Sequence, residues 1–472
     1  MTIEQIYTGC LAQGAYYIQS GNEAVVIDPL REVAPYIQKA ERNKATIKYV
    51  LETHFHADFV SGHLDLAKKT GATIVYGPEA QPAFEAHIAK DGEALKVGNI
   101  TIQVIHTPGH TMESSCYLLK DEKGRPVALF SGDTLFIGDV GRPDLAQKVK
   151  AELTQDVLAA HLFDSLRNKI MTLPDDVVIY PAHGAGSACG KNMSKETTDT
   201  LGHQKQTNYA LRPDMTKDEF IKEVTTGLTT PPSYFPLNVM MNIKGYESID
   251  KVLERGQHAF DPDAFEAAAN ETGALILDTR DAQVFAKGFI PNSINIGIDG
   301  NFAPWVGAMI PDIRQEILLI TDEGREEEVI TRLARVGYDF TIGYLKGGFA
   351  SWKKAGKETD AIRSVSADEL ADLQKKEGVN ILDVRKKSEY DSEHLLNAEN
   401  MPLDVINEHM PMLDRNKTYY VHCAGGYRSM IFNSTLKARG YDNLVDIQGG
   451  FKAIKDSGNF KISEYVCPTT ML

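Results

Sequence analysis

The feature that most constrains the fold is a set of histidines and aspartates, each placed after a short apolar run. Thr53-His54-Phe55-His56-Ala57-Asp58-Phe59 follows the run 47–51, and Thr107-Pro108-Gly109-His110 and Ser131-Gly132-Asp133 follow runs of their own. Runs rich in Val and Ile that stop at Gly or Pro predict β-strands. Metal-binding side chains delivered by several strand ends indicate an α/β domain with a metal site at those ends. We therefore expect such a domain over residues 1–190.

The length and the charge of the chain limit the other classes of function. A chain of 472 residues suggests about three domains at roughly 150 residues each. The net charge of −15 argues against nucleic acid or an anionic membrane as a partner, and no apolar run approaches the ~20 residues that span a bilayer. The N-terminus shows no basic segment followed by an apolar one, and the five cysteines argue against a disulfide framework. These features predict a cytoplasmic protein.

An internal repeat fills the C-terminal half of the chain. Ile276-Leu277-Asp278-Thr279-Arg280 matches Ile381-Leu382-Asp383-Val384-Arg385, and Gly347-Gly348-Phe349 matches Gly449-Gly450-Phe451. Apolar runs alternate with amphipathic helical stretches in each copy, which predicts a doubly wound α/β domain used twice. The predicted segments after residue 190 are a helical extension and linker (191–257), the two repeats (258–360 and 361–462) and a tail (463–472).

The metal-binding motif resembles that of the metallo-β-lactamase fold, an αββα sandwich. Members of that family carry Thr-His-x-His-x-Asp-His in this loop, and the chain follows the pattern up to the last position, where Phe59 stands. A phenylalanine has no lone pair to donate, so a second metal ion loses a ligand at this position. The resemblance and Phe59 together predict a mononuclear site.

Within that fold family, the persulfide dioxygenases use one iron, and the segment 131–144 resembles their pattern around an aspartate ligand. The resemblance implies that His54, His110 and Asp133 hold one Fe(II) per chain on one face, although the sequence alone leaves zinc open. Other residues are expected to support these ligands or to line a substrate pocket: His56, Asp58, His183, Arg142 and Asp144.

Cys189 follows His183 by six residues in a glycine-rich stretch. Its position beside a pocket histidine fits a residue that lines the iron site or holds sulfur transiently. The sequence supports a structural thiol equally well.

The second repeat carries a cysteine in a short loop between a strand-like run and a helical run. The loop resembles the active-site loop of rhodaneses, which are sulfurtransferases. Four residues separate Cys423 from Arg428, a tight spacing suited to one sulfane sulfur, whereas related phosphatases use five. Backbone N–H groups and Arg428 are expected to stabilise a thiolate or a bound persulfide anion. The residues of this anion-binding loop are Ala424, Gly425, Gly426, Tyr427 and Ser429.

The first repeat lacks this chemistry. Its equivalent loop is predicted to read Asp322-Glu323-Gly324-Arg325, two residues shorter than the loop of the second repeat and without a cysteine. We interpret the first repeat as a degenerate rhodanese-like domain.

The resemblance over nearly the whole chain is to persulfide dioxygenase–rhodanese fusions. It implies oxidation of a low-molecular-weight thiol persulfide by O2 to sulfite, with Cys423 moving sulfane sulfur to or from thiosulfate in sulfide detoxification. We also expect a homo-oligomer. Two alternatives are a metal-dependent thioester hydrolase of the glyoxalase II type and a sensor that uses Cys423 stoichiometrically. Phe59 argues against the hydrolase, because those enzymes keep the second metal site.

Overall fold

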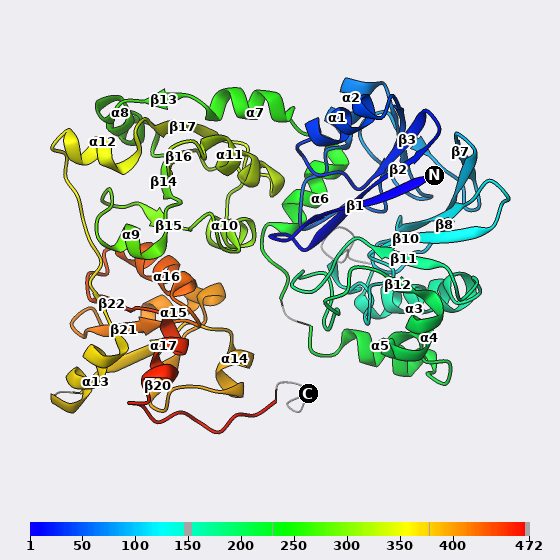
Figure 1. Ribbon diagram of the computed structural model, residues 1–472. Helices are drawn as coiled ribbons and strands as arrows, with labels where there is room; N and C mark the ends of the chain where they lie inside the picture. Colours follow the sequence, from blue (N-terminus) through cyan, green and yellow to red (C-terminus); the bar gives the residue numbers. More distant parts are fainter. Residues whose placement is uncertain (146–152, 229, 377, 468–472) are drawn as a thin grey trace. The chain divides into compact units, whose positions relative to one another are not determined.

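The computed structural model describes residues 1–145, 153–228, 230–376 and 378–467, so residues 468–472 of the predicted tail lie outside the described residues. The chain divides into two compact units (Figure 1). The first unit consists of Met1–Lys251 with Leu333–Asp339, and the second consists of Val252–Arg332 and Phe340–Leu472. None of the helices in the described part of the chain is long and apolar enough to cross a lipid bilayer.

Two six-stranded sheets form the centre of the first unit. The first sheet contains, in spatial order, β1 (Thr2–Thr8), β2 (Gln13–Ser20), β3 (Glu23–Ile27), β4 (Thr46–Leu51), β5 (Thr73–Tyr76) and β6 (His87–Ile88). The second contains β12 (Asp199–Thr200), β11 (Val178–Pro181), β10 (Pro126–Gly132), β9 (Ser115–Lys120), β8 (Ile100–His106) and β7 (Ala94–Val97). Its strands β8 and β10 both run antiparallel to β9, and β11 runs parallel to β10. The carboxyl ends of β8, β10 and β11 therefore lie along one edge of this sheet.

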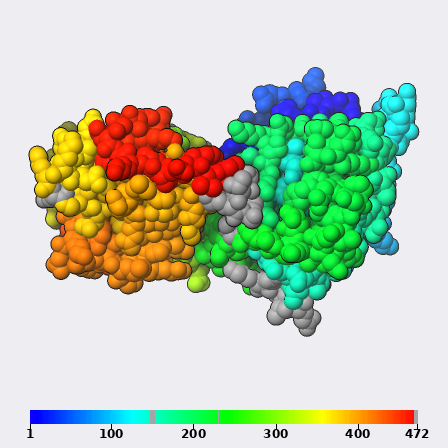
Figure 2. Space-filling model, turned by 90° about the horizontal axis from the view of Figure 1, so that it is seen from below, coloured from blue at the N-terminus to red at the C-terminus, as the bar shows by residue number. Residues whose placement is uncertain are grey.

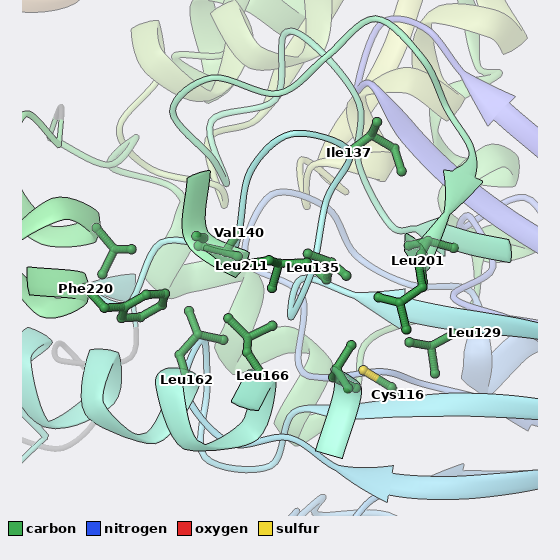
Figure 3. Close-up of a cluster of buried hydrophobic side chains, with 14 of the residues drawn as sticks. Cys116, Leu129, Leu135, Ile137, Val140, Leu162, Leu166, Leu201, Leu211 and Phe220 are labelled. Carbon is green, nitrogen blue, oxygen red and sulfur yellow. The ribbon is translucent and has the colours of Figure 1, made fainter. Parts of the chain in front are cut away.

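Apolar side chains fill three layers around these sheets. Tyr117 and Phe130 lie between the two sheets. Tyr36 of α1 covers the outer face of the first sheet. Leu162 of α3 and Phe220 of α5 cover the outer face of the second, as Figure 3 shows. The helices of this unit are α1 (Ala34–Arg42), α2 (His63–Thr70), α3 (Gln155–Ser165), α4 (Leu201–Thr207), α5 (Lys217–Thr225), α6 (Phe235–Lys244) and the start of α7 (Ile249–Gly256). This arrangement confirms the predicted αββα sandwich.

The second unit contains two modules with the same topology. The sheet of the first module has the order β13 (Ala259–Phe260), β17 (Thr341–Leu345), β16 (Ile317–Ile320), β14 (Leu275–Asp278) and β15 (Ile294–Asn295). The sheet of the second has the order β18 (Ser364–Val365), β22 (Leu444–Ile447), β21 (Tyr419–His422), β19 (Asn380–Asp383) and β20 (Ala398–Asn400). Every strand pair in both sheets is parallel, as predicted for a doubly wound fold.

Helices connect the parallel strands of each module. The first module has α8 (Pro262–Thr272), α9 (Ala282–Ala286), α10 (Phe302–Met309), α11 (Glu326–Arg335) and α12 (Gly348–Lys354). The second has α13 (Ala367–Lys376), α14 (Lys387–Ser392), α15 (Ile406–His409), α16 (Tyr427–Lys437) and α17 (Gly450–Ser457). In Figure 2 the visible face of the second unit is formed mostly by the yellow to red residues of the second module. The fold therefore places the cysteine loop at the carboxyl end of β21, a strand in the middle of its sheet.

Candidate metal centre and cysteine loop

Loops at the strand ends bring the predicted metal-binding side chains of the first unit together. His54 follows β4, His110 follows β8 and Asp133 follows β10. All three side chains are buried, and one ligand atom of each lies within 4.8 Å of those of the other two. The Asp133 Oδ2 atom lies 3.9 Å from His54 Nε2 and 3.4 Å from His110 Nε2. The structure thus gathers two histidines and one carboxylate at a single point.

Hydrogen bonds fix the orientation of both imidazoles. The Nδ1 atom of His110 lies 2.8 Å from the backbone oxygen of Arg142, which can only accept a hydrogen bond, so Nδ1 carries the proton. The Nδ1 atom of His54 lies 3.0 Å from Thr53 Oγ1, whose own hydroxyl donates to Asp28. Both histidines therefore present an unprotonated Nε2 toward Asp133, as metal ligands do.

The carboxylate of Asp133 fits a bound cation. Among the residues that the structure describes, neither of its side-chain oxygens has a hydrogen-bond partner, although both are buried. A buried carboxylate without hydrogen bonds is costly unless a positive charge compensates it. Burial and the neighbouring histidines hold the pKa of His54 well below its usual value, which keeps the imidazole neutral and able to bind a metal ion.

His56 points to a different partner. Its Nε2 atom lies 3.1 Å from Asp28 Oδ1 and 3.6 Å from Glu52 Oε2. Burial opposes a charge on His56, but Asp28 and the other carboxylates nearby outweigh it and raise the pKa of His56 to about 9. The ring of Phe59 is fully buried and packs on the His56 ring at a centroid distance of 4.4 Å.

His183 and Cys189 line the other side of Asp133. The His183 Nε2 atom lies 3.6 Å from Asp133 Oδ1 and 3.5 Å from Asp58 Oδ2. Ligand atoms of His56, Asp58 and His183 also lie within 4.8 Å of one another, and so do those of Asp133, His183 and Cys189. Burial and the two carboxylates raise the pKa of the Cys189 thiol well above its usual value, so Cys189 stays protonated.

The buried Arg142 and the partly buried Asp144 form an ion pair beside the metal-directed residues. The guanidinium donates two hydrogen bonds to the Asp144 carboxylate, at 2.6 and 2.7 Å, and another to the backbone oxygen of Ala188. The backbone N–H of Arg142 donates to the oxygen of Cys189, and its own backbone oxygen accepts from His110. These contacts tie the loop that orients His110 to the loop that carries Cys189.

Sequence reasoning missed one residue that supports this centre. Asn242 of α6 donates hydrogen bonds from Nδ2 to the backbone oxygens of His56 and Phe59, at 2.8 and 2.9 Å, and accepts one from the N–H of Ser61 at 3.0 Å. Its side chain therefore satisfies three backbone groups of the metal-binding loop. No local signal marks this asparagine, because its partners lie more than 180 residues earlier in the chain.

The predicted cysteine loop of the second module lies between β21 and α16. Cys423 is buried, and the N–H of Gly426 donates to its Sγ atom at 3.1 Å. Gly426 has φ of 102°, a conformation that favours glycine. An added Cβ on Gly450 would lie 2.4 Å from the backbone oxygen of Cys423. Because Gly450 has no side chain, the start of α17 can lie against the cysteine loop. The backbone N–H of Gly426 thus points at the sulfur, and the turn at Gly450 packs against the backbone of the cysteine loop.

The remaining predicted residues of this loop have three different partners. Arg428 forms a two-point ion pair with Glu389, with N–O distances of 2.6 and 2.8 Å. The hydroxyl of Ser429 lies 3.8 Å from Cys423 Sγ. The hydroxyl of Tyr427 donates to the backbone oxygen of Gly297 in the first module. Ala424 and Gly425 complete the turn, and both are exposed or near the surface.

The predicted loop length of the first module was wrong by one residue. Strand pairing aligns Asp278 with Ile320 and Asp383 with His422, so Thr321 occupies the position of Cys423. Arg325 then stands four positions after Thr321, one fewer than Arg428 after Cys423. The sequence prediction aligned Arg325 with Arg428 and began the loop at Asp322. It therefore left out Thr321 and made the loop two residues shorter instead of one. Arg325 instead pairs with Asp299 and Glu328.

Protein-family comparisons match the N-terminal sandwich and the two C-terminal modules separately. Residues 8–183 match the metallo-beta-lactamase superfamily, and residues 261–355 and 366–457 each match the rhodanese-like domain. A crystal structure described as a metallo-beta-lactamase from Staphylococcus aureus subsp. aureus COL is 34% identical, with a TM-score of 0.64, covering 73% of this chain and 98% of that one.

Curated relatives of the first unit are named as hydrolases. One probable hydroxyacylglutathione hydrolase of Schizosaccharomyces pombe is 32% identical over 38% of this chain and 67% of its own length. A second from the same organism is 30% identical over 48% of this chain and 80% of its own length. The architecture and these matches agree: the chain belongs to the metallo-β-lactamase superfamily through its N-terminal domain and joins that domain to two rhodanese-like domains.

Proposed function

We propose that this chain is a non-haem Fe(II) persulfide dioxygenase joined to a sulfurtransferase. It oxidises a low-molecular-weight thiol persulfide with O2 and one water to sulfite and the free thiol, and Cys423 moves sulfane sulfur to or from thiosulfate. The observation that carries the proposal is the geometry around Phe59. Its buried apolar ring occupies the last motif position and offers no ligand atom, and His56 lies 3.1 Å from Asp28, whereas His54, His110 and Asp133 form a three-ligand group.

Two histidines and one carboxylate are the ligand set of many non-haem Fe(II) oxygenases. His54, His110 and Asp133 would hold the Fe(II), which would supply the electrons that activate O2. The protein holds the ligands in place: Arg142 O and Thr53 Oγ1 fix the two imidazoles, and the buried surroundings exclude bulk water. His183 and Cys189 lie on the other side of Asp133, where the persulfide would be bound.

The cysteine loop suits the second half of the reaction. A thiolate at Cys423 attacks the outer sulfur of a persulfide or thiosulfate, so that a new S–S bond forms at Cys423 and the bond to the leaving thiolate or sulfite breaks. The N–H of Gly426 points at Sγ and stabilises the negative charge. Carrying both sites on one chain raises the effective concentration of the sulfur intermediate.

A metal-dependent thioester hydrolase is the second candidate, because the hydroxyacylglutathione hydrolases of S. pombe are similar to the first unit. In that case the metal ion would lower the pKa of a bound water, and the Cys423 loop would be incidental. The two candidates differ in their use of O2. A third possibility, stoichiometric sensing through Cys423, predicts one modification per chain and no turnover.

One set of measurements separates the three candidates. Protein loaded with Fe(II) under anaerobic conditions is analysed for metal and then supplied with O2 and a thiol persulfide, or with a glutathione thioester. We expect one iron per chain, catalytic O2 uptake and sulfite release. Asp133→Ala should lose iron and O2 uptake, whereas His203→Ala, a matched change at an exposed histidine, should keep both. Two zinc ions per chain, or thioester turnover without O2 uptake, would overturn the proposal in favour of the hydrolase.

A further inference from the structure

We propose that the degenerate module completes the sulfur site of its neighbour: Gln283 positions the carboxylate of Asp446, and this carboxylate receives the Cys423 thiol proton through Ser429. The inference rests on the proposed sulfur-carrying role of Cys423. It assigns a function to a module that has no cysteine of its own in the loop.

A continuous set of polar contacts leads from the cysteine to the other module. Cys423 Sγ lies 3.8 Å from Ser429 Oγ, within the range of a weak S–H hydrogen bond. Ser429 Oγ lies 2.9 Å from Asp446 Oδ1 and donates to it. The other carboxylate oxygen of Asp446 accepts a hydrogen bond of 2.7 Å from Gln283 Nε2 on α9 of the first module. The side chains of Ser429 and Asp446 are fully buried.

The direction of proton movement follows from the hydroxyl group of Ser429. This hydroxyl has one proton, and it has two acceptors in reach: the Asp446 carboxylate and the backbone oxygen of Gly426 at 3.1 Å. A carboxylate is the stronger acceptor. With its proton directed to Asp446, the hydroxyl offers a lone pair to the thiol of Cys423. The thiol proton can then pass to Ser429 as the serine proton passes to Asp446, which leaves a Cys423 thiolate and a protonated carboxyl.

The carboxyl of Asp446 has the acidity that this step needs. Burial raises the pKa of Asp446 to about 6, and the hydrogen bonds from Gln283 and Ser429 limit the rise. Near neutral pH the group is ionised, yet it is a far better proton acceptor than an exposed aspartate. Loss of the Gln283 hydrogen bond removes a stabiliser of the ionised form and raises this pKa further. More of the acceptor is then already protonated at neutral pH.

The other charged groups that face the cysteine are paired within the second module. Arg428 of α16 pairs with Glu389 of α14, and Arg385 pairs with Asp383 at the end of β19. Burial lowers the pKa of His422 of β21, which keeps that imidazole neutral near pH 7.

Packing between the two modules holds Gln283 in place. Phe285 and Phe289 of the first module form an apolar cluster with Met430 of α16. The N–H of Asn295 donates to Ser434 Oγ, also on α16. The helix that carries the cysteine loop is thus fixed by the first module next to the residue that contacts Asp446.

The test measures how fast Cys423 reacts at pH values where its thiol carries the proton. The rate of alkylation of Cys423 by iodoacetamide is followed from about pH 5 to about pH 10 by mass spectrometry of the Cys423 peptide in the full chain. We expect Asp446→Asn to lower this rate near neutral pH at least about tenfold and to abolish its rise around pH 6, because the proton acceptor is lost, and Gln283→Ala to lower the rate less. Ser429→Ala should match Asp446→Asn, while Ser429→Thr, which keeps the hydroxyl, should restore the wild-type rate.

Matched controls are Asp456→Asn and Gln374→Ala, which change exposed residues of α17 and α13 and should leave the profile unchanged. Gln283 is only partly buried and Asp446→Asn is nearly isosteric, so circular dichroism should confirm folded proteins. Unchanged alkylation rates near neutral pH in folded Asp446→Asn and Gln283→Ala overturn the inference. Failure of wild-type Cys423 to take up sulfane sulfur from thiosulfate overturns the proposed sulfur transfer instead. The alkylation profile would still report on the proton acceptor.

Discussion

The two modules of the second unit share a framework and differ in one loop. Each ends its second strand with a buried aspartate that pairs with the arginine two residues later, Asp278 with Arg280 and Asp383 with Arg385, at 2.5 and 2.6 Å. Each arginine also lies over the ring of a phenylalanine that follows two glycines. The Cζ atom of Arg280 is 4.4 Å from the ring centre of Phe349, and that of Arg385 is 4.1 Å from the ring centre of Phe451.

The difference lies between the strand end and the next helix. The first module has Thr321 followed by Asp322 and Glu323, whereas the second has Cys423 followed by small residues. Because the Asp–Arg pair persists where there is no cysteine, it serves the framework of the module. The second module differs in that its loop carries a cysteine. Substitutions at matched positions of the two modules test this difference.

Removal of the cysteine should have the largest effect. We expect Cys423→Ser to lower the rate of sulfur transfer from thiosulfate at least about a thousandfold, because a serine hydroxyl cannot carry sulfane sulfur. O2 uptake with a thiol persulfide should stay within about twofold of wild type. Thr321→Ser at the matching position of the first module is the control and should change neither rate. Sulfur transfer that survives in Cys423→Ser would mean that another cysteine carries the sulfur.

Loss of either framework arginine should destabilise its module to a similar degree. Arg280→Ala and Arg385→Ala each leave a fully buried aspartate without its partner, which costs about 3–5 kcal/mol. The measurement is the free energy of unfolding in urea, with the exposed Arg314→Ala as the control. A large loss of stability for one variant and none for the other would show that the frameworks are not equivalent.

Substitution of the first glycine of each pair should have a smaller effect. Gly347 and Gly449 adopt φ of 75° and 71°, where a Cβ costs roughly 1–2 kcal/mol. Gly347→Ala and Gly449→Ala should therefore both lower the melting temperature, and Gly449→Ala should lower it more, because its Cβ would lie 2.8 Å from the Cβ of Ala453, against 3.2 Å from that of Ser351 at Gly347. Gly9→Ala, at a glycine with no neighbouring atom within 4 Å of an added Cβ, is the control. An unchanged melting temperature in either variant would contradict the strain argument.

A cysteine placed in the first module should have no effect on sulfur transfer. Thr321→Cys supplies the thiol, but the loop is one residue shorter and Asp322 and Glu323 repel an anionic persulfide. We expect the double variant Thr321→Cys, Cys423→Ser to transfer no more sulfur than Cys423→Ser alone. Activity above that background would show that the loop length does not matter.

Much of the molecule could be predicted from the sequence because its signals are local. Strand ends followed by His54, His110 and Asp133 indicated an α/β domain that gathers these side chains, and the resemblance of the motif indicated the sandwich. The repeat indicated the two modules. What could not be predicted depends on contacts between distant segments, such as the Gln283–Asp446 hydrogen bond between modules. The loop-length error has the same origin, because only strand pairing aligns Thr321 with Cys423.

The hydrogen bonds of Asn242 determine how long a fragment must be to keep the metal-binding loop in its structure. All the metal-directed side chains lie before residue 190, but three backbone groups of their loop are satisfied by a helix that spans Phe235–Lys244. An excised fragment that stops at residue 190 keeps every ligand and loses this support. For recombination or engineering, the smallest transferable piece is therefore longer than the stretch that its motifs mark, and it reaches at least to the end of α6.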